Sequence, residues 1–182
     1  MKKITLAIFT ILTISCAREN PFLITEHSIG KLDKLTQIRE LKKVFAKDSI
    51  ANEVSGDEFL DLGNDIKIYD KQGNPLLILE AEEEFDSTSV IKTVRVMDSR
   101  FKTEKGLNIN STFKEVKEHY TISKITNTLS VAIVNIEELN AYIAINKKEL
   151  PADLLFDTKS KIELTDIPDN AKIKYFFIDW EN

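Results

Sequence analysis

The sequence predicts an α+β fold of two similar halves, each a helix packed on antiparallel β-strands. Three observations lead to this fold class: two amphipathic helical patterns, several runs of strand-like alternation, and the recurrence of one element order along the chain. Its 182 residues suit one domain, predicted over residues 22–182, with an internal duplication of about 22–104 and 105–182.

The first predicted helix begins after Thr36, a residue type that caps helix N-termini well. Ile38, Leu41, Val44 and Phe45 recur at helical spacing, while charged residues fill the positions between them. This pattern predicts one apolar helix face that packs against a sheet.

The second predicted helix begins at Thr112. Glu115 follows three residues later, which is the spacing of a capping box. Phe113, Val116 and Tyr120 then recur at helical spacing and predict the buried face.

Much of the remaining chain is predicted to form strands. Residues 66–69 and 90–96 alternate in polarity, and the apolar run 75–79 follows a turn-like segment at 70–74. The later strands are expected at 131–134, 141–145 and 173–178.

The predicted duplication rests on three aligned pairs of segments. Residues 36–45 align with 111–120, with two of ten positions identical and most others conservative. The other aligned pairs are 74–79 with 140–145, and 90–96 with 172–178. The same order of helix and strands therefore occurs twice.

Composition excludes two classes of protein. The formal net charge is −5, and loss of Lys2 and Lys3 with a leader would make it −7, whereas nucleic-acid binding needs a basic surface. A fold held by disulfides needs paired cysteines, and Cys16 is the single cysteine of the chain. We expect no nucleic-acid partner and a domain stabilised by its apolar core.

The N-terminus has the layout of a secretory signal peptide over residues 1–15. Lys2 and Lys3 precede an uncharged stretch, residues 4–15, which is shorter than the ~20 residues that a membrane-spanning helix needs. Residues 13–16, Thr-Ile-Ser-Cys, resemble a lipobox, with a small residue before the cysteine. The resemblance implies that Cys16 is lipidated and becomes the first residue of the mature protein.

Lipidation would place the domain at a membrane. A diacylglycerol thioether and an N-linked acyl chain such as palmitate anchor durably where one chain does not. Residues 16–21 form the expected tether, which spans ~20 Å when extended. Ala17 stands where enterobacterial inner-membrane lipoproteins have Asp, which by analogy implies the outer membrane, on its periplasmic or surface face.

The N-terminus is similar to those of Bacteroidota cell-envelope lipoproteins, whose relaxed lipoboxes it matches. Residues 106–117, Gly-Leu-Asn-Ile-Asn-Ser-Thr-Phe-Lys-Glu-Val-Lys, resemble the opening of repeats in envelope proteins. With Ser28-Ile29-Gly30, the Gly106-Leu107 pair also resembles an envelope-stress-regulated enterobacterial lipoprotein family. These resemblances imply an envelope location and no particular chemistry.

No catalytic or cofactor-binding set is predicted. The histidines are His27 and His119, and a hydrolase that uses His119 is the catalytic alternative, although the chain has no G-x-S-x-G nucleophile turn. Three-residue matches to a Bacteroidota O-glycosylation acceptor make Ser49 and Ser87 candidate glycosylation sites.

An acidic run supplies the candidate metal ligands. Glu82, Glu83, Glu84 and Asp86 carry the hard oxygens that Ca²⁺ prefers, without the spacing of an EF-hand loop. A Ca²⁺-stabilised binding module is therefore a second alternative. The sequence as a whole predicts a lipid-anchored envelope protein that acts as a non-catalytic binding or assembly module, with an envelope protein as its possible partner.

Overall fold

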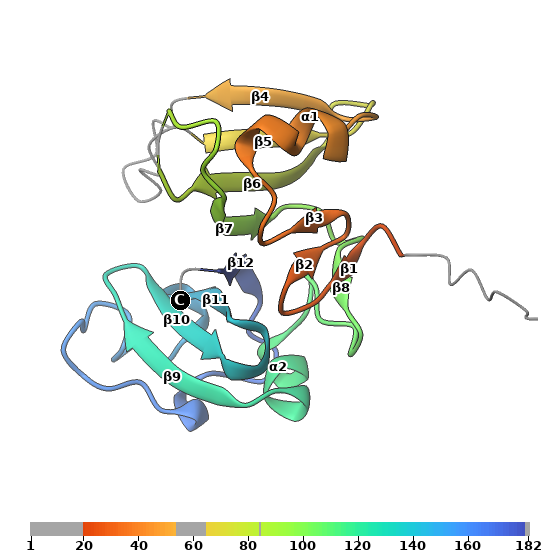
Figure 1. Ribbon diagram of the computed structural model, residues 1–182. Helices are drawn as coiled ribbons and strands as arrows, with labels where there is room; N and C mark the ends of the chain where they lie inside the picture. The colour runs from red at the N-terminus through yellow and green to blue at the C-terminus, as the bar shows by residue number, and fades with distance from the viewer. Residues whose placement is uncertain (1–19, 54–64, 84, 181–182) are drawn as a thin grey trace, which may run out of the picture.

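The computed structural model describes residues 20–53, 65–83 and 85–180. Within them the chain forms one eight-stranded antiparallel sheet, in the order β4-β5-β6-β7-β12-β11-β10-β9, and one four-stranded sheet, in the order β3-β2-β1-β8 (Figure 1). The strands of the large sheet are β4 (Ser49–Glu53), β5 (Asp65–Tyr69), β6 (Pro75–Ala81), β7 (Ile91–Val96), β9 (Ile122–Asn127), β10 (Val131–Ile136), β11 (Ala141–Asn146) and β12 (Ile173–Asp179). Those of the small sheet are β1 (Leu23–Ile24), β2 (Ser28–Ile29), β3 (Leu32–Asp33) and β8 (Lys102–Thr103).

The helices of the described chain are short. They are the α-helices α1 (Leu41–Val44) and α2 (Phe113–His119) and the 3-10 turns η1 (Ile38–Glu40), η2 (Glu137–Leu139), η3 (Lys147–Glu149) and η4 (Leu164–Asp166). Thr112 is the N-cap of α2, and its backbone N–H donates to the Glu115 carboxylate at 2.7 Å, as the capping-box pattern predicts.

The predicted α+β fold class is wrong, because the described chain is mostly β. The first predicted helix is reduced to η1 and the single turn α1, with Gln37 rather than Thr36 as N-cap. The backbone N–H groups of Ile38 and Arg39 donate to carbonyls of the segment before β7, so this stretch is held in place by the sheet. The described chain also does not form two halves that are each a helix packed on its own strands, since β7 pairs with β12 in one continuous sheet.

The two halves of the large sheet nevertheless share a pattern of backbone hydrogen bonds between a helix start and the sheet. Each half is an antiparallel four-strand meander, and each helix start is tied to the segment that enters the central strand. The corresponding N–H to carbonyl bonds are Ile38 to Ser89 and Arg39 to Ser87 in one half, and Phe113 to Ala171 and Lys114 to Asp169 in the other. The predicted duplication of the chain stays a prediction, which this repetition supports.

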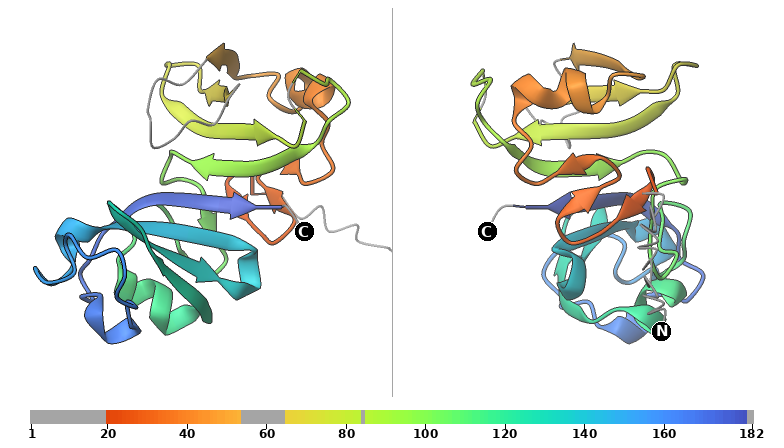
Figure 2. Two further views of the ribbon diagram at one scale, coloured as in Figure 1. Left: turned by 90° about the vertical axis from the view of Figure 1, so that its left-hand side faces the viewer. Right: turned by 45° about the vertical axis from the view of Figure 1, so that its right-hand side comes forward.

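The core lies on one face of the large sheet. Leu77, Val94, Ile143 and Phe176 point into it and are fully or almost fully buried, together with apolar residues of both α-helices and the small sheet. In Figure 1 the small sheet lies beside the β7–β12 junction, and Figure 2 shows the strong twist of the large sheet between its β4 and β9 ends. The small sheet thus packs where the two meanders meet.

Aromatic and cationic side chains line the other face of the sheet. By strand register Arg95, Phe177 and Tyr142 stand side by side on β7, β12 and β11. The Tyr142 and Phe177 rings stack at 4.7 Å between centroids, and the Arg95 guanidinium lies 4.2 Å from the Tyr175 ring centroid. These contacts stabilise the junction strands from the side opposite to the core.

The start of the described chain is fixed by a close backbone approach at Gly30. Gly30 has a φ of +59°, and its N–H donates to the Leu23 carbonyl at 2.7 Å. A Cβ at this position would lie 2.2 Å from the carbonyl oxygen of Pro21. Only glycine therefore lets the chain at Pro21 lie against the β2–β3 turn.

We expect Gly30→Ala to lower the free energy of unfolding by more than about 1 kcal/mol, because it combines a left-handed φ with a backbone clash. Gly106→Ala is the matched control, since Gly106 also has a positive φ, of +88°, but a Cβ there would meet no atom within 4 Å. Urea denaturation of both variants measures the difference. Equal losses would show that the contact with Pro21 does not constrain the chain.

Candidate functional site

A pocket of about 360 Å³ opens next to Pro21, beside the small sheet. Four cationic residues stand around it, Lys31, Lys43, Lys47 and Arg100, and all four are exposed. Its floor is apolar and buried, and consists of Ile29, Phe45, Leu76 and Phe101. We call this site the basic pocket.

The cations of the basic pocket come from separate parts of the chain. Lys31 lies in the β2–β3 turn, Lys43 in α1, and Lys47 in the connection from α1 to β4. The Phe45 N–H donates to the Leu41 carbonyl at 2.8 Å and completes the turn of α1. In this turn Phe45 is buried, and the neighbouring lysines are exposed to solvent. The fold therefore gathers charges that are dispersed in the sequence.

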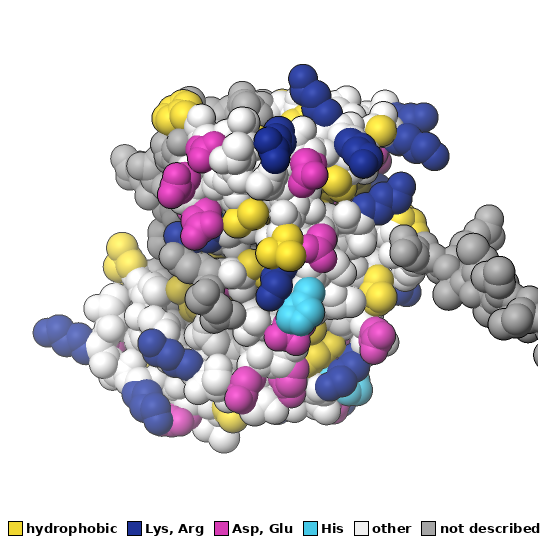
Figure 3. Space-filling model, viewed as in Figure 1, with side chains coloured by type: hydrophobic (Ala, Val, Ile, Leu, Met, Phe, Trp, Pro, Cys, Tyr) yellow, Lys and Arg dark blue, Asp and Glu magenta, His cyan; other side chains and the backbone are white. Residues whose placement is uncertain are grey.

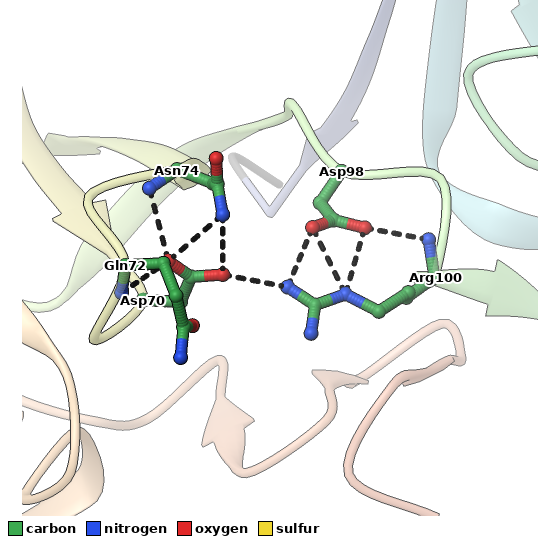
Figure 4. A network of polar contacts seen from close by, with 5 residues as sticks. All are labelled: Asp70, Gln72, Asn74, Asp98 and Arg100. Carbon is green, nitrogen blue, oxygen red and sulfur yellow. Dashed lines mark hydrogen bonds and ion pairs between the residues drawn. The ribbon is translucent and has the colours of Figure 1, made fainter.

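Arg100 is held by two carboxylates (Figure 4). Its Nε donates to both oxygens of Asp98 at 3.0 and 3.1 Å, and its Nη2 donates to Asp98 at 2.7 Å and to Asp70 at 3.3 Å. The guanidinium also lies 4.8 Å from the ring centroid of Phe22, which packs edge-on against Phe101. Arg100 therefore ties the β5–β6 turn, the β7–β8 connection and the segment at Phe22 together.

Hydrogen bonds keep both carboxylates of this network ionised. The Arg100 side chain lowers the pKa of Asp98 below its ordinary value. The pKa of Asp70 is also lowered, first by the side-chain amide of Asn74 and then by backbone N–H groups and Arg100. Asp70 accepts from the backbone N–H groups of Gln72 and Asn74 at 2.9 Å each, so hydrogen bonds within the turn stabilise its negative charge.

The lysines of the pocket are not neutralised in this way. Within the described residues, no ion pair or hydrogen bond from the ammonium group is found for Lys31, Lys43 or Lys47. Lys and Arg side chains gather over α1 and the adjacent strand ends in Figure 3. In a chain of net charge −5, this region presents an excess of positive charge to an incoming anion.

The structure does not bring the catalytic alternative together. His119 is exposed at the end of α2, where its carbonyl accepts from the Lys105 ammonium at 2.6 Å. No hydrogen bond joins its imidazole to a serine or a carboxylate of the described chain, and His27 is exposed beside Glu26. A hydrolase that uses His119 stays a prediction that no contact supports.

The other predicted sites are partly described. Glu82 and Glu83 are exposed, Asp86 accepts two hydrogen bonds from Thr88, and Glu84 lies outside the described residues. No group of three potential metal ligands is found in residues 20–53, 65–83 and 85–180. Ser49 and Ser87 are exposed, in β4 and in the segment before β7, and Cys16 with the predicted signal peptide lies outside the described chain.

The sequence predictions missed the basic pocket, although a signal for it was present. Residues 31–47 contain six basic and two acidic residues, against an acidic balance for the chain as a whole. The sequence does not show that Arg100 and the apolar floor join this segment, because those contacts depend on strand order.

Comparison with known proteins defines a fold and leaves the function open. No family model and no curated protein matches the chain. A solved structure, that of the uncharacterized protein YfeY from Escherichia coli, is similar to it with a TM-score of 0.55 at 12% identity, and the match covers 86% of this chain and 99% of that one. The chain is thus distantly similar in fold to an uncharacterised enterobacterial protein. Across the described residues, no helix has the length and apolarity needed to span a bilayer.

The Arg100 network predicts a measurable loss of stability. Arg100→Ala should lower the free energy of unfolding by about 1 kcal/mol, the upper range for a pair that is partly exposed. Arg100→Lys should restore little of it, because an ammonium cannot make the paired contacts of a guanidinium. Lys161→Ala, which breaks the exposed Lys161–Glu163 pair, is the control and should leave the urea midpoint unchanged. A similar midpoint for all three variants would refute the role of Arg100.

The buried carboxylate of Asp65 should destabilise the folded protein at neutral pH, whereas the Arg100 network stabilises it. Asp65 is 3% exposed, its Oδ1 has no hydrogen-bond partner among the described residues, and burial raises its pKa to about 6. Because the folded state holds this proton more tightly, the free energy of unfolding should fall as pH rises from about 4 to about 6. Asp65→Asn should therefore stabilise the protein by about 2 kcal/mol at pH 7 and have no effect below pH 4.

Urea denaturation across this pH range tests the assignment. Asp98→Asn is the control, because the lowered pKa of Asp98 makes its charge stabilising at neutral pH. A loss of stability for Asp65→Asn at pH 7 would contradict a destabilising buried charge at Asp65.

Proposed function

We propose that this chain is a lipid-anchored cell-envelope protein whose folded part is a non-catalytic binding or assembly module. Cys16 is its lipidated residue, and the outer membrane is its location. The observation that carries the proposal is the N-terminal sequence, in which the lone cysteine follows a stretch with the charge and length of a secretory signal.

The geometry of the described chain supports this proposal. Asn20, the first residue that the structure describes, is four residues after Cys16. The chain then passes Pro21, at the edge of the basic pocket, and is held there against Gly30. A membrane that holds Cys16 would thus lie within ~20 Å of the pocket.

The proposal includes a narrower class of protein. The relaxed lipobox is typical of Bacteroidota lipoproteins, and the helix entries resemble those of an envelope-stress-regulated enterobacterial lipoprotein family. The similarity of fold to an E. coli protein is compatible with that second resemblance. A partner protein in the envelope is the expected ligand of an assembly module.

Replacement of the anchoring thiol tests the proposal. Cys16→Ser should abolish metabolic labelling with palmitate, because serine cannot form the thioether, and should reduce the share of the protein in the membrane fraction. The wild-type chain should carry the label. Ser15→Ala is the control, since a small residue before the cysteine preserves the lipobox pattern.

The proposal fails if wild-type protein takes up no palmitate, or if the Cys16→Ser protein is still lipid-labelled. Fractionation without labelling is not sufficient, because an uncleaved apolar leader of twelve residues could hold some protein on membranes.

A further inference from the structure

We propose that the basic pocket binds the headgroups of anionic phospholipids in the membrane to which the protein is anchored. This inference rests on the proposed lipid anchor for its biological setting and on the geometry of the pocket for its chemistry. It assigns a partner, an anionic lipid surface, to a part of the domain that the anchor itself does not involve.

The charges around the pocket favour an anionic ligand. Lys31, Lys43 and Lys47 point toward solvent without a carboxylate partner in the described chain. Of the acidic residues nearby, Asp98 is paired with Arg100, and Asp70 is bound by Arg100 and by the backbone of the β5–β6 turn. Asp48 also lines the pocket and is half-buried, which leaves the lysines in excess.

The floor of the pocket suits an amphiphile better than a free ion. Phe45, Leu76 and Phe101 are buried there, and Val44 and Phe22 are partly exposed at its edge. A volume of about 360 Å³ lies in the range of small-molecule sites. Apolar side chains beneath a cationic rim allow the glycerol region of a lipid to pack while its phosphate meets the lysines.

The short tether makes the encounter effectively intramolecular. Pro21 lines the same pocket, so an anchored bilayer stays within ~20 Å of the pocket edge and can come closer. Anionic membrane surfaces attract lysines close to them by an amount that adds up along a cluster. The anchor therefore raises the local concentration of lipid headgroups at the domain, and the pocket determines which side of the domain faces the bilayer.

Vesicle sedimentation of the chain without its anchor tests the pocket separately. Every core residue of the described chain lies between Ile24 and Ile178, so residues 17–182 contain the whole described core. This chain should sediment with vesicles in which phosphatidylglycerol replaces about a third of the phosphatidylcholine, and not with phosphatidylcholine alone.

Charge reversal locates the binding surface. Replacing Lys31, Lys43 and Lys47 together by glutamate should weaken binding at least ~10-fold, whereas replacing all three by arginine should preserve it. The matched control reverses three exposed lysines of the other half, Lys124, Lys148 and Lys159, and changes the net charge equally. It should weaken binding less than ~3-fold. Thermal melts establish that each variant is folded.

Three outcomes would overturn the inference: equal binding to both kinds of vesicle, equal weakening by the two glutamate triples, or full displacement by inorganic phosphate, which would indicate a free-anion site. None of them depends on Cys16. Failure here with successful palmitate labelling would leave the anchored-protein proposal intact.

Discussion

The pairing of β7 with β12 is the contact on which the rest of this structure depends. Val94 and Val96 on β7 stand opposite Ile178 and Phe176 on β12, and all four are buried. Without this pairing each meander would expose one more strand edge, and the apolar face would be divided. With it, one core runs beneath eight strands, and the small sheet has a surface on which to pack. The basic pocket forms beside that small sheet.

The pocket combines elements that no single segment contains. Gly30 lets the chain at Pro21 pass close to the β2–β3 turn. Arg100 joins Phe22, in the same part of the chain, to the β5–β6 turn and the β7–β8 connection. Asp70 and Asp98 neutralise the charge of Arg100, so the positive potential of the pocket comes from its lysines.

The sequence was informative wherever burial follows a local period. The strands predicted at 66–69, 75–79, 131–134, 141–145 and 173–178 lie within β5, β6, β10, β11 and β12, because their apolar residues are set by one sheet face. The capping box at Thr112 located α2 for the same local reason. The first helix was predicted as one amphipathic α-helix, whereas the chain forms the 3-10 turn η1 and the single turn α1, because the same apolar spacing suits a turn that hydrogen-bonds to the sheet.

Features set by distant contacts were not predictable in this way. β9 was missed because Ile122 and Ile125 are three residues apart, and a β-bulge opposite Asn135 and Ile136 turns both toward the core. The single sheet, and hence the overturned fold class, follows from strand order. The basic pocket needed the three-dimensional meeting of residues 21–48 with Asp70 and Arg100.

The orientation of the domain on a bilayer, under the proposed lipid anchor, is the most direct test of the central claim that the basic pocket faces lipid. If Cys16 is consumed by the anchor, an added cysteine is the only thiol for a fluorescent label. Ala46→Cys places the label at the pocket, and Ala152→Cys places it on an exposed loop of the second meander's half. With nitroxide headgroups in vesicles that contain phosphatidylglycerol, the account predicts strong quenching at residue 46 and weak quenching at 152. Equal quenching, or the reverse order, would contradict it.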